Sequence, residues 1–295
     1  MNTALLTTVM TLASCVFLAG SSTEPARVQS DFKERDEINR TFQLAPGTSV
    51  EVSSIRGSVE ISNSNSSTAE VQVIRTARTR ADLEYHKVEV EQIGNRLVVR
   101  GERDFEDRRG RDVRVNHHVI LKLPRQIDLS ATSISGSVRA GDVDGQIKVT
   151  SISGSVTAGN VGGAIQARSI SGSFEVGIVG AEAHVNSVSG NVVVAQLKGS
   201  LDVTSVSGSV KATVDQIDTH GIKITSVSGS VEIGLRGDVN ADFSADSFSG
   251  RVYLDVPGVT RSTEVDSSSV RARIGVGGSP IKIFSVSGNI RLTRS

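Results

Sequence analysis

The residues with the clearest capacity for chemistry are one adjacent histidine pair and a few acidic side chains. Imidazole and carboxylate groups hold metal ions and act as general acids or bases. His117 and His118 form the only histidine pair. Adjacent residues of a strand face opposite sides of a sheet, so these two cannot readily bind one ion together. We therefore expect each to be a structural or surface histidine.

Two groups of carboxylates invite a metal interpretation. Asp142 and Asp144 flank a turn, as aspartates do in some calcium-binding β-rolls. The following repeat has Asn160 and Gly162 instead, and later repeats show no carboxylate pair, which favours ordinary turn aspartates. The second group is Glu102, Asp104, Glu106 and Asp107. Three arginines lie among these four acids, which is typical of a solvated charge run. No metal and no cofactor is expected.

Serines recur at regular intervals and could form hydroxyl-bearing rows. The first row is Ser135, Ser153, Ser171, Ser189, Ser207, Ser228, Ser249, Ser267 and Ser287, and the second is Ser137, Ser155, Ser173, Asn191, Ser209 and Ser230. A flat hydroxyl face could bind ice or glycan, but ice-binding faces favour threonine, and neither row contains any. Glycan sites rely on aromatic platforms, and the chain has no Trp and only Tyr85 and Tyr253. We interpret the rows as a solvated face with no catalytic serine, because no serine stands out from its equivalents.

The single cysteine lies in an N-terminal apolar segment. Ala4–Leu18 is uncharged and mostly apolar, but it is shorter than the ~20 residues that a membrane-spanning helix needs. Small residues follow it, so we assign 1–22 as a signal peptide and 23–37 as a linker. Leu12-Ala13-Ser14-Cys15 also fits a lipobox, in which Cys15 would be lipidated, and a plain membrane anchor is the third interpretation. The remainder is predicted to be exported, to the periplasm, the cell surface or the medium.

The elements that position these side chains are set by an internal repeat. The hexad Ser-(Ile/Val/Phe)-Ser-Gly-(Ser/Asn/Arg)-(Val/Phe/Ile) recurs down the chain, with its glycines at Gly136, Gly154, Gly172, Gly190, Gly208, Gly229, Gly250 and Gly288. Their spacings are 18, 18, 18, 18, 21, 21 and 38 residues, the last gap holding a degenerate copy at Ser267–Val270. An early copy contains Gly57. Strand-like alternation within each repeat predicts an all-β fold, a single-stranded β-solenoid with coils of 18–21 residues.

Stacked coils bring equivalent residues into columns. One column, expected to face inward, is Val138, Val156, Phe174, Val192, Val210, Val231, Val252, Val270 and Ile290. A second, also expected inward, is Ile134, Ile152, Ile170, Val188, Val206, Val227 and Phe248, and the opposite strand contributes Ile147, Ile165, Leu201 and Ile222. This arrangement requires a bend between Val149 and Ile152. The glycine column is expected to allow close backbone packing in a narrow coil.

The chain divides by composition into a charged part and a regular part. We assign 38–130 to irregular, charged first coils that cap the solenoid and 131–295 to regular repeats. Terminal coils need caps, because open sheet edges aggregate. The C-terminal end is predicted to be less protected, since Ile290 and Leu292 lie close to the last residue.

Several motifs resemble a bacterial family of exported β-strand-repeat proteins, a domain of unknown function described as adhesin-like. The opening Phe42-Gln43-Leu44-Ala45-Pro46-Gly47, the segment Leu121-Lys122-Leu123-Pro124 and the Ser-x-Ser-Gly-Ser-Val units all fit its pattern. The resemblance covers about residues 38–295. It implies a β-solenoid and carries over no catalytic residue.

Composition narrows the function further. With 32 basic and 32 acidic residues, the chain lacks the basic excess that nucleic acid or an anionic membrane would attract. We predict an exported, non-enzymatic β-solenoid that acts as an adhesin-like or cell-envelope scaffold or binding module. Its partner would be a cell-envelope protein or glycan, with membrane contact only through a lipid anchor. Two alternatives stay open: a scaffold that self-associates end to end through its C-terminal coil, and a polysaccharide-acting β-helix enzyme.

Overall fold

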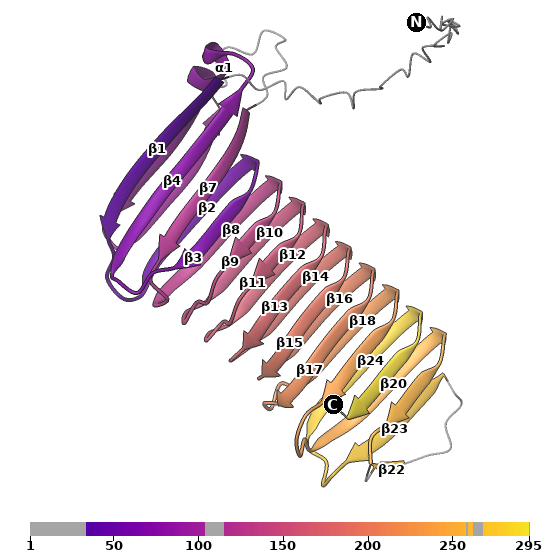
Figure 1. Ribbon diagram of the computed structural model, residues 1–295. Helices are drawn as coiled ribbons and strands as arrows, with labels where there is room; N and C mark the ends of the chain where they lie inside the picture. The colour runs from indigo at the N-terminus through magenta and orange to yellow at the C-terminus, as the bar shows by residue number, and fades with distance from the viewer. Residues whose placement is uncertain (1–33, 104–114, 258, 262–267, 295) are drawn as a thin grey trace, which may run out of the picture. The chain divides into compact units, whose positions relative to one another are not determined.

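The computed structural model describes residues 34–103, 115–257, 259–261 and 268–294. These residues form two facing β-sheets, sheet A and sheet B, whose strands are mostly parallel (Figure 1). The predicted signal peptide with Cys15, most of the predicted linker and the acids from Asp104 to Asp107 fall outside the described residues. No helix in the described part is long and apolar enough to cross a membrane.

Sheet A lies on one side of the core. Among the described residues its order is β1 (Glu34–Gln43), β4 (Thr68–Ala77), β7 (Val115–Leu123), β3 (Val59–Asn63), β9 (Val138–Ala140), β11 (Val156–Ala158), β13 (Phe174–Val179), β15 (Val192–Lys198), β17 (Val210–Gln216), β19 (Val231–Leu235), β25 (Ile290–Arg294) and β21 (Val252–Asp255).

Sheet B lies on the other side. Its order over the same described ranges is β22 (Val259–Arg261), β23 (Ser269–Ile274), β20 (Ala241–Ser249), β24 (Ser279–Ser287), β18 (Ile222–Ser228), β16 (Leu201–Ser207), β14 (Ala183–Ser189), β12 (Ile165–Ser171), β10 (Ile147–Ser153), β8 (Ile127–Ser135), β2 (Thr48–Arg56), β6 (Arg96–Arg103) and β5 (His86–Ile93).

Each coil is one strand of sheet B, a sharp corner at a repeat glycine, and one strand of sheet A. The predicted all-β solenoid is therefore confirmed. The first inward column is confirmed apart from Val270, and Val138, Val192 and Ile290 are each completely buried. The opposite-strand column from Ile147 to Ile222 is equally buried. These two columns meet between the sheets and form a continuous aliphatic core.

The second column was predicted to face inward, but in the structure it faces outward. Its members from Ile134 to Phe248 are exposed, and the serines that precede them are buried, as Ser133 and Ser151 illustrate. The reason lies in where the chain bends. Strand β10 continues without a break from Ile147 to Ser153, so alternation carries Ser151 inward and turns Ile152 out. The bend comes only at the glycine that follows.

A buried serine suits this corner because little room remains inside it. The Ser151 hydroxyl donates to the Gly154 carbonyl, three residues on, at 3.1 Å, and Ser133 and Ser169 bond in the same way across their own corners. The hydroxyl thus satisfies a carbonyl that the turn leaves without a regular ladder partner.

Each repeat glycine makes the corner possible in two ways. Gly172 has φ +137°, a conformation that side chains rarely allow, and an added Cβ would lie 2.3 Å from the carbonyl oxygen of Gly154 in the previous coil. Gly57 of the early copy belongs to the same column, with φ +118°. The expected close backbone packing is confirmed, and the backbone conformation is a second requirement that the pattern alone did not show.

The N-terminal end is capped by an excursion of the chain. Strands β2 and β3 form a coil of the ordinary kind, which stacks on the coil of β8 and β9. Between these two coils the chain leaves to build β4, the helix α1 (Arg80–Tyr85), β5, β6 and β7. Strands β1 and β4 pair antiparallel, as do β5 and β6. The edge strand β1 carries five charged residues among its ten, which discourages edge-to-edge pairing.

The C-terminal end is not the last coil in sequence. Strands β24 and β25 insert between the coil of β18 and β19 and the coil of β20 and β21. Ile290 and Leu292 are therefore completely buried, and the expectation that they are less protected is wrong. The prediction that Val270 belongs to the inward column is also wrong, because Val270 lies on β23, which runs antiparallel to β20. The coil of β20 and β21 is the last in space, so end-to-end stacking would involve β21, the edge strand of sheet A among the described residues, rather than β25.

Two ion pairs join the antiparallel strand β23 to β20, Arg271–Asp246 and the more exposed Arg273–Asp242. The two terminal nitrogens of the Arg271 guanidinium donate to the Asp246 carboxylate at 2.9 and 3.0 Å. The Ser269 hydroxyl donates to the same carboxylate at 2.6 Å. The Arg271 hydrogen bonds outweigh the opposing desolvation and hold the pKa of Asp246 below its usual value. A carboxyl with a lowered folded-state pKa stabilises the fold above its unfolded-state pKa of about 3.9, and that stabilisation is lost as the pH falls through the folded value.

We expect Asp246→Asn to loosen β23 at neutral pH. Both partners are about two-fifths exposed, so screening limits the loss to about 1 kcal/mol or less. Amide hydrogen exchange of β23 should accelerate, while the distant β10 stays unchanged. On acidification below pH 4 the wild-type protein should show the same local loss of protection, measured against the intrinsic exchange rate at each pH, and the variant should not. Equal pH dependence in the two proteins would contradict the assignment.

Candidate interaction surface

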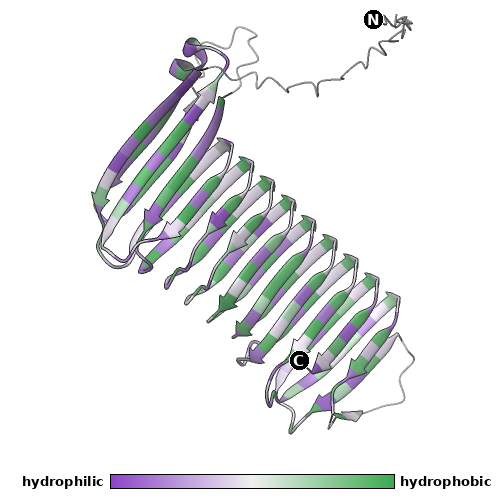
Figure 2. Ribbon diagram, in the orientation of Figure 1, coloured by the Kyte–Doolittle hydropathy of each residue, from purple (hydrophilic) through white to green (hydrophobic). Residues whose placement is uncertain are grey.

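The second column, which was expected to face inward, forms a continuous apolar row on the outer face of sheet B. We call it the apolar ladder, and its rungs in order across the sheet are Ile134, Ile152, Ile170, Val188, Val206, Val227, Val286 and Phe248. Exposure ranges from 38% for Val286 to 86% for Phe248, and the other six rungs lie between 44% and 53%. Figure 2 shows hydrophobic segments, in green, at the heads of successive sheet B arrows. Scattered exposed aliphatics are normal on proteins, but eight consecutive rungs are not.

Parallel register keeps the rungs aligned. Ser133 pairs with Ser151 and Ser135 with Ser153, which places Ile134 beside Ile152 on the neighbouring strand. The same register holds through the following strands up to β24 and β20. Adjacent rungs are therefore separated by the strand spacing of about 4.8 Å.

A shallow groove runs beside the ladder and has an almost wholly apolar surface. Its volume is about 340 Å³, and it passes Ile152, Ile170, Val188 and Val206. Its other wall is formed by Thr150, Arg168, Asn186 and Thr204. These four belong to the next outward column, which is Thr132, Thr150, Arg168, Asn186, Thr204, Thr225, Phe284 and Asp246. Only Arg168 and Asp246 in that column carry charge. The ladder therefore lies in a nearly neutral strip.

The first predicted serine row borders the ladder on its other side. Ser135, Ser153 and their equivalents up to Ser287 are exposed at the corner, as predicted, apart from Ser267, which lies outside the described residues. Sequence reasoning thus found the hydroxyl row and its neighbouring column. It missed that the aliphatic column shares the same solvent-facing surface.

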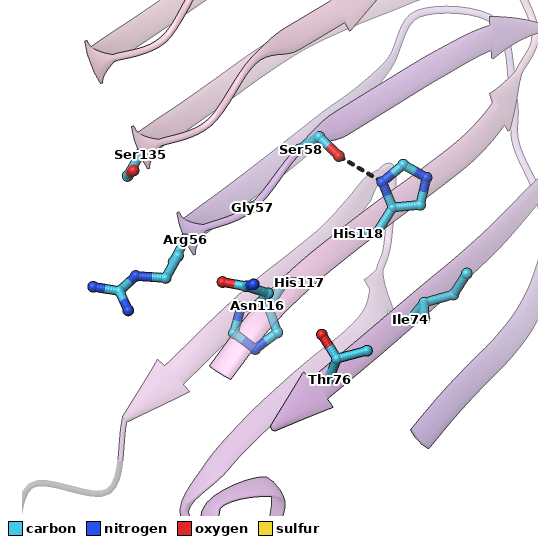
Figure 3. A pocket seen from close by; sticks show the side chains of 9 residues that line it. All are labelled: Arg56, Gly57, Ser58, Ile74, Thr76, Asn116, His117, His118 and Ser135. Carbon is cyan, nitrogen blue, oxygen red and sulfur yellow. Dashed lines mark hydrogen bonds between the residues drawn. The ribbon is translucent and has the colours of Figure 1, made fainter. Parts of the chain in front are cut away.

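The histidine pair lies on β7 of sheet A, beside a pocket near the N-terminal end of the stack (Figure 3). His117 is buried, with its ring 6.2 Å from that of His86, and His118 faces outward. The two therefore face opposite sides, as predicted. His118 Nδ1 lies 2.5 Å from the Ser58 hydroxyl, and its Nε2 lies 3.9 Å from a Glu60 carboxylate oxygen.

This serine, histidine and glutamate resemble a nucleophilic triad in composition but not in geometry. At 3.9 Å, His118 and Glu60 are too far apart for the hydrogen bond that orients a catalytic base. Glu60 also faces Arg139 at 3.4 Å, which makes it part of a surface ion pair. We assign the group a structural role. Sixty residues separate Ser58 from His118, so no local motif could have joined them.

The turn aspartate Asp142 has a structural partner set. Its carboxylate accepts the backbone N–H of Asn160 in the next coil at 2.9 Å and bonds to Arg125 at 2.6 Å. Asn160 in turn accepts the backbone N–H of Ile178 at 3.1 Å. These side chains link successive turns. Within the described ranges, no cluster of three or more His, Cys, Asp or Glu is arranged to hold a metal ion.

Comparison with known families identifies the repeat. The model of a family described as Toastrack DUF4097 matches residues 47–293. The chain belongs to the Toastrack DUF4097 family. This confirms the resemblance that the sequence motifs indicated, and the Toastrack coils are those from β2 and β3 to β24 and β25. No curated protein matches the chain.

The solved structures that match this Toastrack protein are distant from it in sequence. A candidate adhesin from Parabacteroides distasonis has 13% identity and a TM-score of 0.45, covering 87% of this chain and 97% of its own. A candidate adhesin from Bacteroides fragilis has 11% identity and a TM-score of 0.42, covering 88% and 97%. A candidate lipid-binding protein from P. distasonis has 13% identity and a TM-score of 0.31, covering 87% and 96%.

Proposed function

We propose that this Toastrack protein is an exported, non-catalytic scaffold or binding module of the cell envelope, and that it engages its partner through the apolar ladder. The observation that carries the proposal is the unbroken row of eight exposed apolar side chains in a nearly neutral strip. Interaction surfaces are distinguished from ordinary surface by large contiguous apolar area with few charges at the centre. Export is inferred from the N-terminal segment 1–22, and Cys15 is the residue that would carry a lipid.

The fold supports a binding role better than a catalytic one. The ladder is built on a rigid parallel sheet, where every rung is fixed by main-chain pairing to both neighbours. Such a surface can hold a partner along its length, but it presents no acid–base pair. Arg168 is the charged residue nearest its centre. One column further, His184 Nδ1 and an Asp202 carboxylate oxygen lie 3.7 Å apart, too far for the hydrogen bond that would orient a catalytic base.

We expect the ladder to be covered in the cell. A thiol introduced by Ile170→Cys should react with a maleimide about tenfold more slowly in envelope fractions than in the dilute purified protein, which corresponds to about nine-tenths occupancy. Thr157→Cys is the matched control, because residue 157 is exposed on the opposite sheet, and its rate should be the same in both samples. Equal rates at residue 170 in both samples would refute the proposed surface.

A further inference from the structure

The spacing of the apolar ladder restricts what can match it. Its rungs repeat once per coil at about 4.8 Å over eight coils, along a direction perpendicular to the strands. A partner that contacts every rung equally must carry apolar groups with the same repeat. A second copy of this chain carries that repeat by construction, and two such rows can interdigitate as facing sheets do in dry interfaces.

The size of the ladder also fits a contact between two copies. At these exposures the eight residues of the ladder offer roughly 700 Å² per copy, above the 300–600 Å² of the largest apolar patch on a typical monomer. The bordering threonines and serines bring the strip close to the ~800 Å² per partner of a standard interface. A homodimer contact is isologous, so one self-complementary patch is sufficient.

Other occupants fit the strip less well. A peptide that adds a strand needs an open sheet edge, but the ladder lies on a face whose main chain is already paired on both sides. A glycan needs aromatic platforms and polar groups, and Phe248 and Phe284 are the only rings in the ladder and its neighbouring column. An anionic lipid surface needs basic residues, and that column offers only Arg168.

We propose that the apolar ladder is a homodimer interface, in which the ladders of two copies pack face to face. Val188 and Val206 are the central rungs, so the two copies meet there whether the ladders run in the same or in opposite directions. The inference rests on the proposed function, because it names the partner of the same surface. It also replaces the end-to-end mode of self-association with a lateral one.

Sedimentation of the purified full chain over a range of concentrations tests this inference. Wild-type protein should show a monomer–dimer equilibrium, and Val188→Asp should weaken the dimer roughly 100-fold or more, since each dimer would bury two unpaired carboxylates. Thr157→Asp is the control, and it should leave the equilibrium unchanged. Circular dichroism melts in the monomeric range confirm that both variants are folded.

A crosslinking arm keeps the test independent of the charged variant. In a Cys15→Ser background, Val188→Cys and Val206→Cys, alone or mixed, should give a disulfide-linked dimer under mild oxidation, and Thr157→Cys should not. The homodimer proposal is wrong if the wild-type protein is monomeric at every concentration. It is also wrong if Val188→Asp leaves the dimer's dissociation constant unchanged. A monomer that retains acyl lipid on the ladder would overturn it as well.

The two proposals fail differently. If the purified protein is monomeric but residue 170 is protected in envelope fractions, the ladder has another partner, and only the homodimer is wrong. If residue 170 is also unprotected, the ladder is not an interaction surface and both proposals fall.

Discussion

Gly172→Ala is expected to lower the melting temperature of the solenoid by roughly 6–12 °C, the shift that about 3 kcal/mol produces in a domain of this size. Two costs add. The residue has φ +137°, where any side chain is strained by about 1–3 kcal/mol. In addition, its Cβ would lie 2.3 Å from the Gly154 carbonyl oxygen and 2.6 Å from the carbonyl carbon, so the coil spacing must open locally.

Gly94→Ala is the matched control for that substitution. Gly94 also has a positive φ of +58°, but nothing lies within 4 Å of the position that its Cβ would occupy. Its cost should be limited to the conformational term of about 1–2 kcal/mol. Thermal melts followed by circular dichroism compare the two. If both variants melt together, close approach between coils is not what requires glycine at the corner.

The parts of the fold that were predictable from sequence are those that depend on period alone. The repeat fixes strand alternation, coil length and which residues stack into columns, because equivalent positions must meet when coils pair in parallel. The column of Val138 and Val192 and the outward serines followed from this. The prediction that Ile134 and Ile152 stack in one column is also confirmed, although the side that the column faces was wrong.

Which side a column faces depends on the position of the bend, and period does not determine that. Within Ser-Ile-Ser-Gly both the serines and the isoleucine alternate, so hydropathy alone puts Ile152 inside. The corner decides otherwise, because a serine is small enough for it and can bond the Gly154 carbonyl. Assigning alternating aliphatic residues to the core, which is usually correct, therefore placed the residues of the candidate interaction surface inside the protein.

The order of the last coils was unpredictable for a different reason. Val252 and Ile290 both match the register of any neighbouring coil, so the sequence does not specify which of them stacks on Val231. In the structure Ile290 does so, and Val252 follows it. Long-range pairings of interchangeable repeats carry no local signal. The contact of Ser58 with His118 also lacks a local signal, because sixty positions separate the two residues and His118 lies on β7, outside the repeated coils.

Val192→Asp should unfold several coils together and cost about 4 kcal/mol or more. Val192 is completely buried in the column between Phe174 and Val210, where a carboxylate would have no water and no cationic partner within the described core. Because each coil depends on its neighbours for burial and ladder hydrogen bonds, the damage should spread to adjacent coils rather than remain in one. Native-state hydrogen exchange should show protection lost across β13, β15 and β17.

The decisive comparison for that variant is Val188→Asp in the same coil. Residue 188 belongs to the column that hydropathy placed inside and the structure places outside, at 47% exposure. If the corner bends at the glycine, a carboxylate there stays in water, and the monomer should lose less than about 1 kcal/mol. Melts at a concentration low enough to keep both variants monomeric separate this effect from dimer dissociation. Equal destabilisation by the two substitutions would mean that both columns lie in the core and that the apolar ladder is not on the surface. A large difference would show that residue 192 faces the core and residue 188 faces solvent.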